Sequence, residues 1–339
     1  MSVQRRQSKL AMDKPPSGQS DQSSITKKSS PNLIALVVLF YFVISLSVVF
    51  LNKIILSSAK YDFPYPLFVT WFQLLVALFL LIVCSEVGKW NPSISLIPPY
   101  EFDPVIAIRI APLTAIYVHM LVFNNLCLKY VEVTFYQVAR SLSINFTILF
   151  TYIILGQKTS PSALLACLIV FLGFAIGSLG EINFSWSGII YGVGSSAFVA
   201  LYGIYVKKSL PIVAYNEYKL LHYNTTMAII LLGSILLCSN EVGAIWQNLA
   251  AYNNSKLWTL MVLTGITGFG INISVFLQVK FTSPLTNTIS GTAKSCLQTL
   301  LATLIFQNTI TTTNAIGIFL AIFGSSYYSY IRYREMISK

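Results

Sequence analysis

Long apolar runs of about twenty residues recur along this chain, from near residue 33 almost to its C-terminal end. A helix needs about twenty apolar residues to cross the hydrocarbon core of a bilayer. The composition agrees, because 55% of the 339 residues are hydrophobic and only 10% are charged, which is not typical of a soluble domain. The sequence therefore predicts an all-α integral membrane protein embedded in a lipid bilayer.

The length and hydropathy of the runs predict ten transmembrane helices. The polar, serine-rich and basic residues 1–32 should form a disordered tail, and residues 332–339 should form a second, short tail. The expected spans are 33–56, 66–87, 105–127, 133–154, 162–179, 187–206, 221–239, 258–279, 285–305 and 313–331.

The two halves of the chain resemble each other. Segments 129–157 and 280–308 both run from a Lys-aromatic pair through an apolar span to a polar amide, at an offset of 151 residues. Five spans per half is an odd number, so the second copy must be inverted in the membrane, as in many transporters. We therefore expect two inverted five-helix repeats, 33–180 and 181–331.

Lysine and arginine set the expected orientation, because cytosolic loops carry an excess of these residues. With the N-terminus in the cytosol, 16 of the 22 basic residues lie on the cytosolic side and 4 on the other. Both termini are therefore expected to be cytosolic. The net charge of +11 then follows from topology and gives no reason to expect nucleic acid as a partner. The sequon at Asn253 falls in an expected lumenal loop, and another at Asn183 lies close to a membrane end.

Two basic residues fall inside expected spans, Arg140 in the fourth and Lys294 in the ninth. A cation near the bilayer centre costs about 2.5–3.5 kcal/mol on insertion scales, so it usually marks an ion or substrate path. The repeat aligns Arg140 with Gly291 and Lys294 with Ser143, one helical turn apart on equivalent helix faces. The alternative interpretation is a lysine that snorkels to an interface, or a packed helix of small residues.

No acidic residue lies well inside a span, so neither cation has an obvious carboxylate partner. Unpaired buried cations are costly, and the missing anion is most simply the substrate. Two fixed positive charges suit a diphosphate, with arginine as a bidentate fork and lysine as a point charge. The same lack of carboxylates argues against a membrane glycosyltransferase and against a proton-coupled pump.

The sequence also gives no reason to expect an enzyme, a metal site or a cofactor. It contains no Asp-x-Asp and no His-Glu-x-x-His motif, and His119 and His222 each stand alone on an apolar span. The five cysteines show no spacing typical of a metal site or a disulfide framework. We expect them to pack as small apolar residues.

The seventh span opens with a polar cluster that contains Tyr223 and Asn224. An asparagine amide offers a donor and an acceptor, which can read the edge of a purine, and a tyrosine can stack on the ligand or bond to it. A polar cluster that only starts the helix is the alternative interpretation.

Longer motifs carry a resemblance to a known family. They are Val49–Lys53, Phe123–Val131, Phe135–Leu142, Lys280–Thr286 and Ser290–Lys294. In these stretches the chain resembles the nucleotide-sugar transporters of the drug/metabolite transporter superfamily, and the similarity extends over about residues 34 to 335. Within that family it looks most like the Golgi group that carries GDP-fucose.

The resemblance implies a substrate site. In the related GDP-mannose transporters, a Phe-Tyr-Asn-Asn motif on the seventh span reads guanine, which implies that Tyr223 and Asn224 lie beside the base. A Gly-Ala-Leu-Asn-Lys motif on the ninth span holds the phosphates and the sugar. The matching positions here are Ser290, Gly291, Thr292, Ala293 and Lys294.

Three further residues follow from the same resemblance. Tyr41 on the first span would line the sugar pocket, and Asn287 would face the sugar one turn before Gly291. Tyr136 belongs to the motif around Arg140 and completes the expected site. The chain departs from the family pattern at His222 and Thr225, where the guanine motif has phenylalanine and asparagine; a threonine cannot supply the paired donor and acceptor of an amide.

The implied function is a Golgi antiporter that imports GDP-fucose and exports GMP. Alternatives are another anionic substrate, such as GDP-mannose, a UDP-sugar or a sugar phosphate, and a non-transporting membrane scaffold of the same fold. The last four residues contain no dilysine signal and no Lys-Asp-Glu-Leu signal, which favours the Golgi over the endoplasmic reticulum. The oligomeric state is left open, and a homodimer is compatible with the sequence.

Overall fold

The computed structural model describes residues 31–57, 61, 63–90, 102–180, 185–248, 250, 252–281, 284–306 and 311–337. These described residues contain helices, turns and loops but no strand, and every expected span coincides with helical structure. The elements are α2 (Pro31–Ser57), α3 (Pro66–Trp90), α4 (Pro104–Tyr130), α5 (Val133–Ser141), α6 (Ser143–Leu155), α7 (Pro161–Leu179), α8 (Trp186–Ser209), the 3-10 turn η1 (Leu210–Val213), α9 (Glu217–Cys238), α10 (Glu241–Gln247), α11 (Ser255–Phe281), α12 (Pro284–Phe306) and α13 (Thr312–Ile337).

Local sequence signals explain where several helices begin. Proline occupies the first position of α4 and of α7, where its missing N–H removes no helical hydrogen bond. The side chain of Asp103 accepts a hydrogen bond from the N–H of Val105 at 2.8 Å and caps α4. The Asn216 side chain caps α9 in the same way, by accepting from the N–H of Lys219 at 2.9 Å.

Eight helical segments of the described chain are long and apolar enough to cross a membrane. They correspond to the first eight expected spans. In the described part of α12 the apolar stretch is Ala293–Ile305, and α13 is not among the eight. Serines and tyrosines interrupt α13 near residues 325–330, which lowers its hydropathy. The described part of the chain is therefore all-helical, with eight candidate spans.

The fourth expected span is two helices rather than one. The chain turns at Leu142, whose N–H donates to the carbonyls of Ala139 and Arg140 instead of continuing the α-helical ladder. The side chain of Ser141 donates to the carbonyl of Val138 at 2.6 Å, which competes with regular helix at the same place. The break leaves Arg140 in the last turn of α5. Neither this break nor the short helix α10 was predicted from the sequence.

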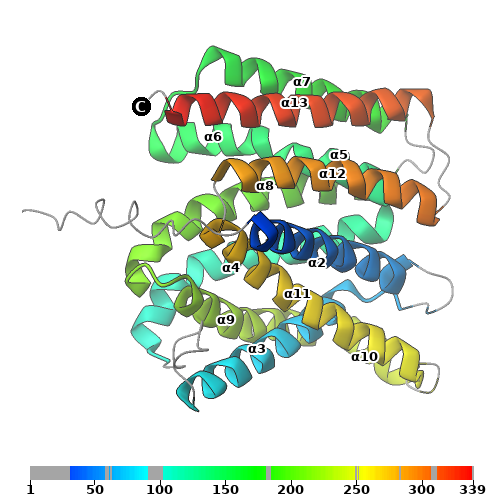
Figure 1. Cartoon of the computed structure of the whole chain (residues 1–339). Coiled ribbons are helices and arrows are strands. Elements are labelled where there is room, and N and C mark those ends of the chain that lie inside the picture. Colours follow the sequence, from blue (N-terminus) through cyan, green and yellow to red (C-terminus); the bar gives the residue numbers. More distant parts are fainter. Residues whose placement is uncertain are drawn as a thin grey trace, which may run out of the picture.

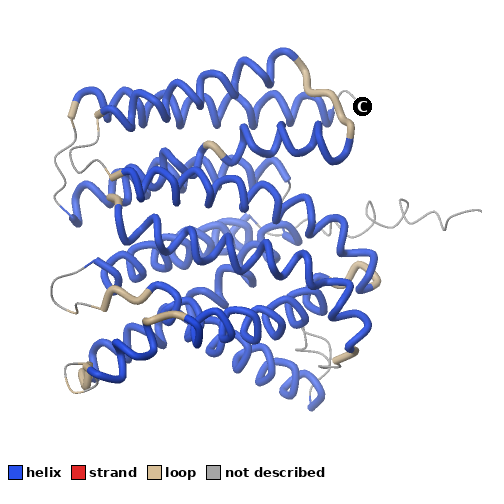
Figure 2. The backbone as a smooth tube through the Cα atoms, turned by 180° about the vertical axis from the view of Figure 1, so that it is seen from behind, coloured by secondary structure: helices blue, strands red, loops and turns tan. Residues whose placement is uncertain are grey.

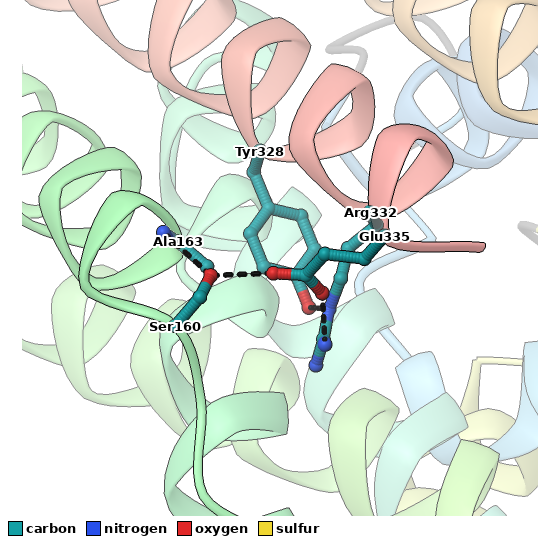
Figure 3. A network of polar contacts seen from close by, with 5 residues as sticks. All are labelled: Ser160, Ala163, Tyr328, Arg332 and Glu335. Atoms are coloured by element: carbon teal, nitrogen blue, oxygen red, sulfur yellow. Dashed lines mark hydrogen bonds and ion pairs between the residues drawn. The ribbon is translucent and has the colours of Figure 1, made fainter. Parts of the chain in front are cut away.

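Helices α7 and α13 form an antiparallel pair along one flank of the bundle (Figure 1). Their backbones approach so closely that a Cβ atom on Gly317 would lie 2.3 Å from the backbone nitrogen of Gly177. At one end of the pair, Arg332 donates to Glu335 at 2.9 Å and to the Tyr328 hydroxyl at 3.1 Å, and Glu335 accepts a hydrogen bond from Ser160, the N-cap of α7 (Figure 3). Close backbone contacts and these polar bonds therefore hold α7 and α13 together along their length.

One end of the bundle is closed by an aromatic and aliphatic cluster from α2, α3, α10 and α11. In it, the hydroxyls of Tyr65 and Tyr252 lie 3.2 Å apart. The carboxylate of Glu241 accepts a hydrogen bond from the N–H of Phe68 at 2.9 Å and so caps α3 from another helix. Burial raises the pKa of the Glu241 carboxyl, and the backbone hydrogen bonds and nearby Lys129 oppose this shift only in part.

The remaining helices form the centre of the bundle. Helix α4 packs on α8 and α9, α11 packs on α2 and α3, and α5 packs on α12. Figure 2 shows the bundle from behind, with helices and loops in the described part of the chain. Residues from both halves of the sequence therefore meet in the middle, where the cavities described next are located.

Candidate functional site

The two cations predicted to lie inside spans face one cavity. Arg140 of α5 and Lys294 of α12 both line a central cavity of about 240 Å³, which also receives side chains from α2, α3, α4, α8, α9 and α11. In the described part of the chain, no carboxylate lies within ion-pair distance of either one. Two basic side chains therefore share one cavity without an acidic partner among the described residues.

Aromatic rings take the place of acidic partners. Arg140 donates a hydrogen bond to the Tyr136 hydroxyl at 2.7 Å, and its guanidinium carbon lies 5.9 Å from the centroid of the same ring. The ammonium of Lys294 lies 5.8 Å from the centroid of Tyr41. Such cation–π contacts favour the charged forms without neutralising them. Both positive charges thus remain available to a ligand.

A chain of buried amides crosses the same cavity. Gln73 of α3 donates to the Asn52 side-chain oxygen at 2.7 Å, Asn52 of α2 donates to Asn125 at 3.1 Å, and Asn125 of α4 donates to the Thr70 hydroxyl at 2.7 Å. All four side chains line the central cavity. Polar groups joined in this way fix the relative positions of the three helices α2, α3 and α4.

We expect the amide chain to stabilise the fold. Replacing Asn125 with alanine removes two hydrogen bonds and leaves the buried amide nitrogen of Asn52 unpaired, which costs about 1–3 kcal/mol, whereas the Thr70 hydroxyl keeps its bond to the Pro66 carbonyl. Thermal unfolding in detergent should therefore occur at a clearly lower temperature. Asn272→Ala is the control, because Asn272 lines the same cavity but bonds only within its own helix, to Gly268 at 3.1 Å. Equal effects of the two substitutions would contradict this role.

A second cavity of about 340 Å³ adjoins the first. This side cavity lies between α5, α6, α12 and α13, with Tyr41 contributed by α2. Arg140 lines both cavities and therefore stands at their junction. Gly291 also lines the side cavity, and a Cβ atom on it would meet nothing within 4 Å, so the space beside its backbone is open.

The remaining predicted site residues are dispersed. Ser290 is buried and Ala293 is exposed, and neither lines the central or the side cavity. Asn287 and Thr292 belong to α12, but their side chains lie outside the described part of the structure.

The predicted base-reading pair also lies off the two cavities. Tyr223 is buried, stacks on Phe102 and accepts a hydrogen bond from the N–H of Asp103 at 2.8 Å. Asn224 is 1% exposed, and both atoms of its amide have no partner among the described residues. On α9 it is Leu221 and Thr225, one turn apart, that reach the central cavity.

Sequence reasoning missed the amide chain and the polar lining of the side cavity. Asn52, Asn124 and Asn125 stand in the motifs that carried the family resemblance, but no role was assigned to them. The available signal was the presence of amides inside apolar spans, where an unpaired amide is costly and demands a partner. Pairing across spans more than seventy residues apart could not be read from the sequence.

Comparisons with known proteins agree on a family. The model of the triose-phosphate transporter family matches residues 32–329. A GDP-fucose transporter 1 from Dictyostelium discoideum is 51% identical over 308 residues, which covers 91% of this chain and 83% of the relative. A GDP-fucose transporter 1 from Mus musculus is 39% identical, and the match covers 89% of this chain and 84% of the relative. A Golgi GDP-fucose transporter from Drosophila melanogaster is also 39% identical, and the match covers 80% of this chain and 81% of the relative.

A solved crystal structure also aligns with this chain. It covers 89% of this chain and 98% of its own, with a TM-score of 0.52 at 13% sequence identity. At that identity the likeness bears on the fold alone.

Proposed function

Since the chain belongs to the triose-phosphate transporter family, we propose that it is a nucleotide-sugar antiporter that imports GDP-fucose into the Golgi lumen in exchange for GMP. The relatives named as GDP-fucose transporters, at 39–51% identity over most of the chain, support the substrate. The observation that carries the mechanism is the pair Arg140 and Lys294, which face one cavity without a carboxylate partner. The chemistry is transport, not catalysis.

In this proposal the diphosphate binds between the two cations. Arg140 supplies a planar fork that can hold two phosphate oxygens at once, and Lys294 supplies a point charge. Tyr136 orients the guanidinium through the hydrogen bond at 2.7 Å, and Tyr41 lies under the ammonium. Gly291 leaves room for the ligand beside the backbone of α12. GMP would use the same charges through its single phosphate.

The central cavity then holds the nucleoside. Rings of Tyr117 and Tyr202 line it and offer apolar surface to a base, while the amide chain offers donors and acceptors. We keep Asn224 as a base-reading residue in the proposal because its buried amide has no described partner, which is the state of a group that waits for a ligand.

We further propose ten transmembrane helices in two inverted repeats. The repeat offset of 151 residues recurs in the starting residues of the helices: Pro66 and Glu217, Pro104 and Ser255, Val133 and Pro284, Pro161 and Thr312. The packing partners follow the same exchange, because α4 lies on α8 and α9 as α11 lies on α2 and α3. Under this scheme α12 and α13 cross the bilayer as the mates of α5–α6 and α7.

The orientation and location belong to the same proposal. The distribution of lysine and arginine favours cytosolic termini, and the relative named as a Golgi transporter favours that compartment. Asn253 is exposed in a loop that would then face the lumen. A homodimer is compatible with this arrangement.

The test is uptake of labelled GDP-fucose by purified protein in proteoliposomes, with a competition panel. We expect unlabelled GDP-fucose and GMP to inhibit uptake. UDP-sugars and sugar phosphates should inhibit it only weakly, because they carry phosphate charges but lack the guanine base. Stronger inhibition by GDP-mannose or a UDP-sugar would move the assignment to another anionic substrate. The absence of any uptake would favour a non-transporting scaffold.

A further inference from the structure

The side cavity is lined by an unusual density of hydroxyl groups for a membrane-embedded space. Six serine and threonine residues from four helices line it. They are Ser141 on α5, Ser143 on α6, Ser295 and Thr299 on α12, and Ser325 and Ser329 on α13. Serine and threonine lower the hydropathy of α12 and α13. Helix formation alone does not explain why these residues occur there, so we consider a role in the cavity.

Five of these six hydroxyls already donate their hydrogen atom to a carbonyl of their own helix. Ser325 donates to the carbonyl of Ala321 at 2.6 Å and Ser329 to that of Ser325 at 2.9 Å. Ser295 and Thr299 donate within α12 at 3.0 and 3.1 Å, and Ser141 donates within α5. What each of these five hydroxyls still offers to the cavity is its oxygen lone pairs. The lining is therefore rich in acceptors.

Gln137 strengthens this bias. Gln137 lines the cavity; its amide nitrogen donates to Ser295 at 2.5 Å, and its side-chain oxygen is buried and has no partner among the described residues. An ionised phosphate offers acceptors only, so it finds few complementary donors in this lining away from Arg140. A group that brings several O–H donors complements it.

The rest of the lining is aliphatic. Val138, Ile144, Ile318, Ala321 and Ile322 supply methyl and methylene surface between the hydroxyls. The cavity thus combines acceptor oxygens with apolar surface. A 6-deoxyhexose has this combination, because three ring hydroxyls lie on its carbon skeleton and a methyl group replaces the sixth-carbon hydroxymethyl.

We propose that the side cavity holds the fucosyl group, with Ser325 and Gln137 accepting from its hydroxyls and Ile322 packing on its methyl group. The inference rests on the proposed function and adds specificity-determining residues on α5 and α13. Its geometry is simple: Arg140 stands where the two cavities meet, so a diphosphate held there extends the nucleoside into the central cavity and the sugar into the side cavity. GMP has no sugar-phosphate extension and leaves the side cavity empty.

The test compares two neighbouring serines of α13. Ser325 and Ser326 make the same bond to the carbonyl four residues earlier, at 2.6 and 2.7 Å, but only Ser325 lines the cavity. Binding of GDP-fucose and of GMP to purified protein would be measured for both alanine variants. Ser325→Ala should weaken GDP-fucose roughly two- to tenfold and leave GMP unchanged. Ser326→Ala should change neither.

A second variant tests the other proposed acceptor. Gln137→Met keeps the length of the side chain and removes both its acceptor and the bond it donates to Ser295, and it should again weaken the binding of GDP-fucose more than that of GMP. Equal losses for the two ligands, or none, in both Ser325→Ala and Gln137→Met would overturn the inference. Wild-type protein that binds neither ligand would instead overturn the proposed function, so the two failures are distinct.

The methyl half is tested with GDP-L-galactose, which differs from GDP-fucose only by a hydroxyl on the sixth carbon. Wild-type protein should bind it roughly tenfold more weakly, because the added hydroxyl meets apolar surface. Ile322→Thr should reduce the difference in affinity between GDP-fucose and GDP-L-galactose. If the wild type binds the two sugar nucleotides equally, the proposed packing of Ile322 on the fucosyl methyl group is wrong.

Discussion

Replacing Lys294 with alanine is expected to lower the affinity for both GDP-fucose and GMP by roughly ten- to a hundredfold or more. Hydrogen bonds to a charged group are worth about 1.5–3 kcal/mol, and the low dielectric of the cavity strengthens the attraction to phosphate. Lys294 has no carboxylate partner among the described residues, so its loss removes ligand binding without orphaning an ion pair. Binding to purified protein and initial uptake rates in proteoliposomes would both report the loss.

A control separates the site from general charge effects. Lys256 is exposed at the start of α11, so Lys256→Ala removes a positive charge far from the cavities and should leave affinity unchanged. Arg140→Lys should be milder than Arg140→Ala but not neutral, because the fork and the bond to Tyr136 are lost. Wild-type uptake by correctly inserted Lys294→Ala protein would refute the diphosphate assignment.

The helices could be predicted closely because hydropathy and length decide them. The span expected at 162–179 is α7 at Pro161–Leu179, and the span expected at 285–305 is α12 at Pro284–Phe306. The break at Leu142 could not be predicted, since no proline or glycine marks it and it depends on local hydrogen bonds to Ala139 and Arg140. The polar stretch near residues 325–330 lowers the hydropathy of α13, and two of its serines, Ser325 and Ser329, line the side cavity.

Sequence reasoning singles out residues that each carry a large energetic cost, and it overlooks groups that share such a cost through hydrogen bonds. Arg140 and Lys294 stand out because a charged side chain in an apolar span is energetically costly and usually functional. Side-chain direction on α9 was harder to predict, because each residue turns the helix by about 100° and motif position alone does not fix which side faces inward. Thr225 reaches the cavity, whereas Tyr223 stacks on Phe102 behind it.

Transport should be mainly exchange, so internal GMP should greatly accelerate uptake of GDP-fucose. Alternating access passes through a closed state in which the site loses bulk water. A bound anion neutralises Arg140 and Lys294 during this step, whereas the empty carrier must desolvate two cations that repel each other. Unit charges about 8 Å apart repel by roughly 2 kcal/mol at an effective dielectric of 20, before any desolvation is added. A barrier higher by about 1.4 kcal/mol already slows a step tenfold.

The measurement is the initial uptake of labelled GDP-fucose into liposomes loaded with GMP or with buffer. Internal guanosine is the matched control, because it carries the same base without the phosphate and should not accelerate uptake. The same reasoning predicts that Lys294→Ala protein, at substrate concentrations that compensate its weaker binding, responds less to internal GMP, since its empty site holds one cation instead of two. Equal initial rates for wild-type protein with and without internal GMP would defeat the exchange mechanism and leave a uniporter that uses the same two cations.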